Sequence, residues 1–127
     1  MEKTLSIAFM VEGAVTPAGH YSHAVVANGF VYVSGQGPAN PSTGKISPVF
    51  SEQVRQTLQN LDTILQGVGS GLKNVVKVNV FLSDVTRFEE YNAVYREFFP
   101  QSPPARTTVG SQLIDILIEI DCVATLS

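Results

Sequence analysis

The segment from residue 51 to residue 82 constrains the fold more than any other part of the sequence. Residues 51–68 carry one apolar stripe, and polar side chains such as Gln53 and Gln56 fall outside it. The stripe has spacings of 4, 3, 4 and 3 and consists of Val54, Leu58, Leu61, Leu65 and Val68. This period predicts an amphipathic helix. Residues 75–82 then alternate, which predicts a strand with one buried face formed by Val76, Val78, Val80 and Leu82. A helix layer on one face of a sheet would bury both apolar surfaces.

The first part of the chain predicts three more strands. Residues 3–9 form a candidate first strand, and Gly29 marks the turn of a hairpin between residues 22–27 and residues 30–34. Residues 35–48 are rich in Gly, Pro, Asn and Ser, which predicts a loop.

The second half of the chain predicts one more helix and two more strands. Residues 86–89 fit a capping box, and the helix that follows should end at Pro100. Its apolar stripe consists of Phe88, Tyr91, Tyr95 and Phe98. Residues 105–109 and 114–125 are the last two predicted strands. The order βββαβαββ predicts an α+β fold with a mixed sheet and two helices packed on one face, in a single domain spanning residues 1–127.

Composition excludes several classes of protein. No run approaches the ~20 apolar residues of a membrane span, and Glu2 beside Lys3 is untypical of a secretory signal. A net charge of −3 with dispersed cations argues against a nucleic-acid partner. The single cysteine, Cys122, excludes an internal disulfide and a cysteine-based zinc cluster, so we expect a cytoplasmic protein. Only 15% of the residues are charged, which predicts that copies of the chain cover part of the surface.

The last predicted strand carries two acidic residues on one face. Glu119 and Asp121 are two positions apart, so their side chains point the same way, roughly 7 Å apart along the strand. Acids flanked by Leu and Ile are costly unless they are paired or solvated. The two open interpretations are a solvent-facing edge and a carboxylate that lines a cleft or a subunit interface.

Arg106 begins an otherwise uncharged strand, directly after Pro103, Pro104 and Ala105. If the loop at residues 110–113 closes a hairpin, Arg106 lies near residues 116–119 of the last strand. A guanidinium group binds both oxygens of a carboxylate, so Arg106 is a candidate for gripping an acidic ligand. The alternative is an ordinary ion pair between Arg106 and Glu119.

Other patterns point to no catalytic centre. His20 and His23 are three positions apart in a segment that runs from loop to strand, where such side chains point in opposite directions, so we predict no metal site. The glycines at 35 and 37 fit neither nucleotide-binding fingerprint. Asn92 lies beside the apolar stripe of the second helix, where a cap or a bond from helix to loop is its simplest role.

Five motifs together resemble one protein family from about residue 16 to residue 125. They are residues 19–25 (GHYSHAV), 33–36 (VSGQ), 92–95 (NAVY) with Phe98 and Phe99, 104–107 (PART) and 118–120 (IEI). In order and spacing they resemble the RidA/YjgF family, the reactive-intermediate deaminases. The resemblance implies a chorismate-mutase-like fold, a homotrimer with clefts between subunits, and no metal or organic cofactor.

The resemblance also implies roles for individual residues. Arg106 matches the arginine that grips the substrate carboxylate, and Glu119 matches the acid that positions or activates the hydrolytic water. Tyr21 and Gly35 match residues that line the substrate pocket, and Asn92 matches another residue of the site. Thr108 stands where many active members have cysteine, so we expect it in the wall of the substrate-binding pocket. His20, His23 and Asp121 also depart from the usual family residues.

The implied activity is that of an imine/enamine deaminase, a hydrolase acting on C–N bonds. Small anionic 2-imino and enamine acids would become 2-keto acids and ammonia, by orientation and one general base. Two alternatives stay open: a non-catalytic trimer that binds small carboxylates such as keto acids, and the endoribonuclease or translation-inhibitor activity that family names carry. A deaminase for another imine, such as an aminoacrylate, is a further variant of the first hypothesis.

Overall fold

Six strands and two α-helices follow one another along the described residues, 5–127, in the order that the sequence predicts. In this computed structural model, the elements are β1 (Ser6–Phe9), β2 (Ala24–Ala27), β3 (Phe30–Gln36), α1 (Phe50–Gly67), β4 (Val75–Leu82), α2 (Phe88–Phe98), β5 (Ala105–Gly110) and β6 (Ile118–Thr125). Short 3-10 turns, η1 (Leu72–Asn74) and η2 (Val85–Arg87), precede β4 and α2. Two predictions concern residues outside this range. They are the start of the first strand at residues 3 and 4, and the signal-peptide interpretation of Glu2 and Lys3.

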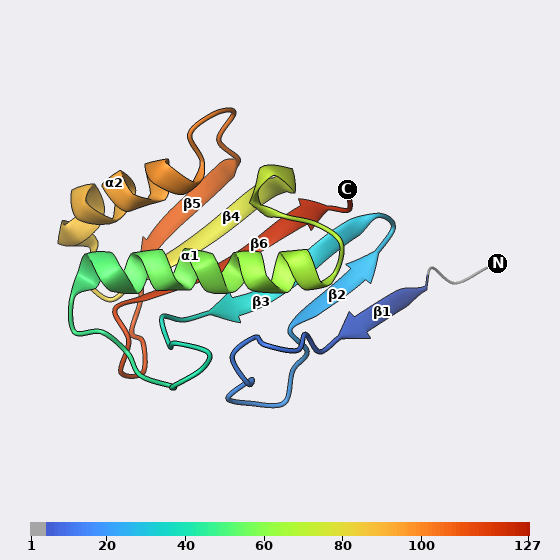
Figure 1. Ribbon diagram of the computed structural model, residues 1–127. Coiled ribbons are helices and arrows are strands. Elements are labelled where there is room, and N and C mark those ends of the chain that lie inside the picture. Colours follow the sequence, from blue (N-terminus) through green and yellow to red (C-terminus); the bar gives the residue numbers. More distant parts are fainter. Residues whose placement is uncertain (1–4) are drawn as a thin grey trace.

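The strands form one mixed sheet in the order β1-β2-β3-β6-β4-β5. Neighbouring strands are antiparallel except β4 and β5, which are parallel and are connected through α2. Both helices lie against the same face of the sheet (Figure 1). The α+β prediction with two helices on one face is therefore confirmed. We call the opposite face of the sheet the helix-free face, because neither helix of residues 5–127 covers it.

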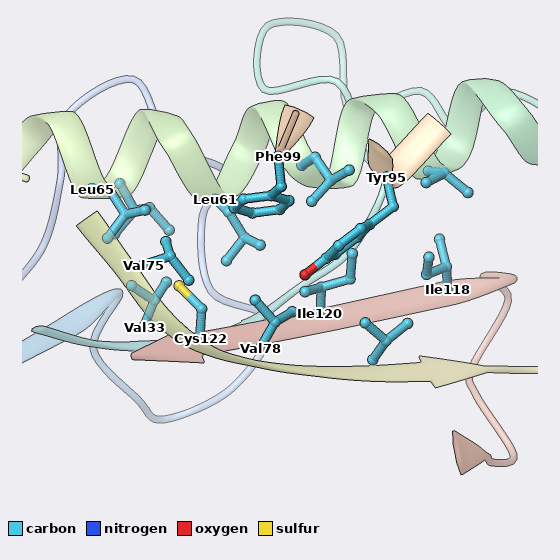
Figure 2. Packing of buried hydrophobic residues seen from close by; sticks show 14 of the residues in the cluster. Val33, Leu61, Leu65, Val75, Val78, Tyr95, Phe99, Ile118, Ile120 and Cys122 are labelled. Atoms are coloured by element: carbon cyan, nitrogen blue, oxygen red, sulfur yellow. The ribbon is translucent and has the colours of Figure 1, made fainter. Parts of the chain in front are cut away.

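The core lies between α1, α2 and the sheet. Leu61 and Leu65 of α1 face Val78, Ile120 and Cys122 of the central strands (Figure 2). The predicted stripe of α1 is confirmed at Val54, Leu58, Leu61 and Leu65, which are at most 1% exposed. Burying each such side chain contributes about 1.5–3 kcal/mol. None of the helices in residues 5–127 has the length and hydropathy to cross a membrane.

The strand predictions are wrong in detail at three places. β3 continues to Gln36, two residues into the predicted loop at residues 35–48. Val76 is 44% exposed, because the register of β4 against β6 shifts between Val75 and Lys77 and turns its side chain out of the buried face. β6 begins at Ile118 instead of residue 114. Asp115 has a left-handed φ of 59°, which interrupts the extended backbone, and Ile114 is 89% exposed. Residues 114–117 therefore form a loop.

The start of α2 also differs from the prediction. The capping box at residues 86–89 does not form: α2 begins at Phe88 without a side-chain cap. Instead, Asp84 accepts hydrogen bonds from the backbone N–H and the hydroxyl of Thr86, so it caps the preceding turn η2. These bonds hold the pKa of Asp84 below its usual value.

The predicted hairpin between Arg106 and the last strand is wrong. β5 pairs with β4 in parallel, with Arg106 opposite Val78, and β6 lies on the other side of β4. The chain therefore crosses β4 between β5 and β6, and the other side of β5 has no neighbouring strand. β5 is consequently an edge strand of the sheet (Figure 1).

Candidate functional site

Arg106 points toward the helices. It lies opposite Val78, whose side chain is fully buried beneath them, and residues opposite each other in neighbouring strands project to the same face. The guanidinium Nη1 donates a hydrogen bond of 2.9 Å to Oδ1 of Asn92 in α2. The simplest interpretation of Asn92 was a helix cap or a bond from helix to loop; its side chain instead binds the candidate site arginine on β5.

Three aromatic rings of α2 surround the guanidinium of Arg106. Its central carbon lies 4.5 Å from the ring centre of Tyr95, 5.2 Å from that of Tyr91 and 5.5 Å from that of Phe88. Such contacts attract a cation to the face of an aromatic ring. The sequence predicted these aromatic residues only as an apolar stripe. The signal for the additional role is that every stripe position of this helix is aromatic.

No carboxylate within residues 5–127 forms an ion pair with Arg106. The ion pairs of this part of the chain are Arg55–Glu97 and Arg87–Glu90, both on the surface. The predicted alternative, an Arg106–Glu119 ion pair, is therefore absent from the described residues. A guanidinium group has several N–H donors, and Asn92 occupies only part of them. Arg106 is thus placed to bind an external anion.

A cavity of about 490 Å³ opens beside this arginine. We call it the Arg106 cavity; its lining includes Asn92, Tyr95, Arg96, Phe99, Pro104 and Arg106. Thr108 is not part of the lining of this cavity. Its Oγ1 lies 2.7 Å from the hydroxyl oxygen of Tyr91, so the two groups share a hydrogen bond.

Glu119, Gly35 and Tyr21 lie together at a second cavity, of about 590 Å³. We call it the Glu119 cavity. Much of its remaining wall is apolar and includes Val15, Pro17, Ile46, Phe81, Ile114 and Ile116. The Tyr21 hydroxyl accepts a hydrogen bond of 3.2 Å from the backbone N–H of Ala18. The structure thus brings together the two predicted pocket residues and the predicted catalytic acid.

Gly35 leaves the space that the Glu119 side chain occupies. A Cβ atom at Gly35 would lie 2.7 Å from Oε2 of Glu119 and 3.0 Å from its carboxyl carbon. Partial burial raises the pKa of Glu119 above its usual value, and the negative charge of Asp121 adds a smaller contribution in the same direction. A carboxylate with a raised pKa is a stronger base, as a general base near neutral pH requires.

Asp121 has a different environment from Glu119. Its Oδ1 accepts a hydrogen bond of 2.9 Å from the side-chain amide of Asn79 on β4. Asp121 is not part of the lining of the Glu119 cavity. Its contacts are those of a cross-strand polar pair that places a negative charge near Glu119.

Two polar residues of α1 hold the loops around the Glu119 cavity, and the sequence prediction missed both. Gln53 accepts a hydrogen bond from the backbone N–H of Leu117 and donates one to the carbonyl oxygen of Ser47. Asn60 donates to the carbonyl oxygens of Gly37 and Ala39. Gln53 and Asn60 are 4% and 3% exposed. Both residues lie outside the apolar stripe of α1 but are nevertheless shielded from solvent.

The two cavities lie on opposite faces of the sheet. Glu119 is opposite Phe81 in β4, one position away from the buried residues Val80 and Leu82, so it projects to the helix-free face. Arg106 projects to the helix side. The structure therefore groups Arg106 with Asn92 and Thr108, and Glu119 with Tyr21 and Gly35, but one chain does not bring the two groups together.

His23 is a structural residue in this fold. Its ring is 3% exposed; Nδ1 accepts a hydrogen bond from the N–H of Val11, and Nε2 lies 2.7 Å from the carbonyl oxygen of Val15. Both nitrogens are therefore occupied. In residues 5–127 no three His, Cys, Asp or Glu side chains gather in a way that would hold a metal ion.

Comparison with known proteins gives consistent matches over nearly the whole chain. Residues 11–126 match the family model described as Endoribonuclease L-PSP. A RutC family protein of Aquifex aeolicus is 41% identical over 110 residues, covering 85% of this chain and 88% of the relative. Reactive Intermediate Deaminase A, a chloroplastic protein of Arabidopsis thaliana, is 38% identical over 118 residues, covering 91% of this chain and 63% of the relative. Among solved structures, E. coli TdcF with bound serine has a TM-score of 0.87 at 30% identity, covering 94% of this chain and 99% of that one.

Proposed function

Because the chain belongs to the Endoribonuclease L-PSP family, the RidA/YjgF family that its motifs resemble, we propose that it is an imine/enamine deaminase. It would hydrolyse small 2-imino and enamine acids to 2-keto acids and ammonia, in the cytoplasm. The observation that carries the proposal is Arg106, a half-buried guanidinium held by three rings and one amide, with no acidic partner among residues 5–127. Such a group favours a small substrate that carries its own carboxylate. The name of the Arabidopsis relative is consistent with this activity.

The reaction requires only water as a co-reactant. An enamine first takes a proton on carbon and becomes the imine. Water adds to the C=N carbon while Glu119 accepts one of its protons and passes it to the nitrogen. The hydroxyl proton of this adduct then moves to the nitrogen through Glu119, the C–N bond breaks as the carbonyl forms, and ammonia leaves. Arg106 would hold the substrate carboxylate throughout, so that the carbon stays in line with the water.

A site that uses both Arg106 and Glu119 needs two copies of the chain, because these residues occupy opposite faces of one sheet. We propose a homotrimer in which the helix-free faces are covered and each cleft combines Arg106 of one subunit with Glu119 of another. The scarcity of charge on the chain supports such a buried surface. The exposed aromatic residues Phe30 and Tyr32 of β3, which project to that face, support it further.

A coupled assay tests the activity. Threonine dehydratase with threonine releases the imine, semicarbazide traps the fraction that persists, and the purified protein should lower the trapped amount. Arg106→Ala should abolish this effect, whereas Arg55→Ala, a matched change at an exposed arginine of α1, should retain it. Absence of acceleration by the wild type, or full activity of Arg106→Ala, would falsify the proposal.

A specific finding favours a second candidate, a non-catalytic carboxylate-binding trimer. A solved relative holds bound serine, a small carboxylate-bearing molecule. Titration calorimetry with 2-oxobutanoate separates the two: saturable binding without any effect in the coupled assay indicates the binding protein. The endoribonuclease name of the family is a weaker guide here, because the chain has a net charge of −3. RNA cleavage that survives purification and is lost in Arg106→Ala would revive it.

A further inference from the structure

A hydrogen bond beside Arg106 has no part in the activity described so far. The hydroxyls of Tyr91 and Thr108 lie 2.7 Å apart. Burial raises the pKa of Tyr91, so its hydroxyl keeps its proton at neutral pH and takes part in this bond as a neutral group. Tyr91 is fully buried, and Thr108 is half-buried.

This bond is one of two that tie β5 to α2. Arg106 and Thr108 are alternate residues of β5 and point to the helix side, and they bind Asn92 and Tyr91, which are neighbours in α2. As an edge strand, β5 has backbone bonds to β4 alone. The two side-chain bonds therefore determine how the Arg106 segment sits against the helix.

Tyr91 is also the middle ring of the surface on which Arg106 rests. Its ring centre lies 5.4 Å from that of Phe88 and 5.8 Å from that of Tyr95, both in edge-to-face geometry. Thr108 provides the hydrogen-bond partner of this ring. A rotation or shift of Tyr91 would change the contacts of all three rings with the guanidinium.

We propose that Tyr91 and Thr108 are positioning residues for Arg106: their shared hydrogen bond fixes the aromatic surface that orients the guanidinium toward a ligand carboxylate. This proposal rests on the proposed function. It also reassigns Thr108, which the family resemblance placed in the pocket wall, to a role exerted through Tyr91. Neither residue needs to touch the substrate.

A double-mutant cycle with 2-oxobutanoate as the probe tests the pairing. Tyr91→Phe and Thr108→Val each remove one hydroxyl and preserve most of the side-chain volume. Each should weaken 2-oxobutanoate binding about fivefold, which corresponds to the typical net contribution of one hydrogen bond. The double variant should bind no more weakly than the weaker single variant, because both remove the same interaction. Thr57→Val, the same change at a fully buried hydroxyl without a hydrogen-bond partner among residues 5–127, should leave the affinity unchanged.

Kinetics distinguish positioning from a general loss of stability. In the coupled assay, KM should rise by the same factor as the dissociation constant while kcat stays near the wild-type value, because Arg106 contacts the carboxylate in both ground and transition state. Thr108→Ser, which restores the hydroxyl, should recover most of the lost affinity. Additive effects of the two single variants, or a fall in kcat with KM unchanged, would overturn the proposal.

A spectroscopic readout keeps the test independent of catalysis. In ¹⁵N NMR, the Arg106 side chain should show slow rotation and slow hydrogen exchange in the wild type, and faster rotation in Tyr91→Phe. If the wild type neither hydrolyses imines nor binds 2-oxobutanoate, the proposed function fails and this measurement still decides the positioning role. If Arg106 behaves identically in the wild type and in Tyr91→Phe, the positioning role is refuted even if the protein is an active deaminase.

Discussion

Arg106 and Glu119 are charged residues in contrasting surroundings. Arg106 has an amide and three aromatic rings as neighbours, so its charge has local support but no neutralising partner among the described residues. Glu119 faces a cavity with a largely apolar wall and lies near the negative charge of Asp121. These surroundings favour the binding of an anion by Arg106 and the protonated form of Glu119.

The raised pKa of Glu119 predicts the acid limb of the pH profile. A general base acts only when deprotonated, so kcat/KM should fall as the pH drops through this pKa, which lies above the usual carboxyl value. Asp121→Asn removes the second cause of the shift, so the limb should move to lower pH. The measurement is kcat/KM between about pH 4 and pH 8. An acid limb at the same pH in the variant would contradict the electrostatic part of this account.

Gly35→Ala should move the Glu119 carboxylate. The nearest three atoms to the added Cβ, at 2.7, 3.0 and 3.3 Å, all belong to the Glu119 side chain, which must turn away. We expect kcat to fall roughly ten- to hundredfold, since a misplacement of about 1 Å has effects of that order. KM should change little, because Arg106 lies on the other face. Circular dichroism checks the fold, and an unchanged kcat would show that Glu119 does not act from this position.

At the scale of elements, α1 both packs against the sheet and binds two loops, and it uses different side chains for each. Its leucines bury the core against the sheet, while Gln53 and Asn60 bind backbone groups of the loops that follow β3 and precede β6. These loops have few backbone bonds of their own, so the helix gives them a rigid support. The wall of the Glu119 cavity therefore depends on a helix whose apolar stripe points elsewhere.

Asn60→Ala should lower the free energy of unfolding and loosen the loop at residues 37–39. The change leaves the carbonyl oxygens of Gly37 and Ala39, two half-buried residues, without their donor. Such a loss costs about 1–3 kcal/mol. Urea denaturation measures it, and Gln59→Ala at the neighbouring exposed position provides the control with an expected effect near zero. Equal stability of the two variants would refute the supporting role of Asn60.

At the scale of the whole molecule, the sheet has one face covered by helices and one face without them (Figure 1). The helix-free face carries Phe30 and Tyr32, at 39% and 48% exposure, together with Glu119 and Asp121. Large exposed apolar groups that lie together on one face are typical of an interaction surface. This arrangement relates the proposed trimer to the proposed activity, because the same face holds half of the proposed site.

Mixing two inactive variants tests whether a site spans two subunits. Arg106→Ala and Glu119→Ala should each be inactive, but chains unfolded and refolded together should recover about a quarter of the wild-type activity, because random pairing rebuilds that share of the sites. Light scattering checks that the mixed oligomer has the mass of a trimer. If both residues acted within one chain, the mixture would recover nothing.

Much of the fold follows from local patterns. The stripe Val54, Leu58, Leu61 and Leu65 and the alternation from Val78 to Leu82 predict elements that the structure contains, because periodic burial is a property of short segments. Two errors have local causes that periodicity does not reveal, namely the bulge at Val76 and the left-handed backbone of Asp115. The burial of Gln53 depends on distant backbone groups, so no local pattern predicts it.

The candidate residues could be selected from the sequence, but their arrangement could not. Residue type and context by themselves mark Arg106 and Glu119 among the few charged groups of apolar strands, and determine the order of strands and helices. Only the tertiary structure decides that β5 pairs in parallel with β4, that Tyr91 and Asn92 reach β5, and that Arg106 and Glu119 occupy opposite faces. The physical reason is that strand pairing joins segments distant in the sequence, and the resulting register determines which face each side chain occupies.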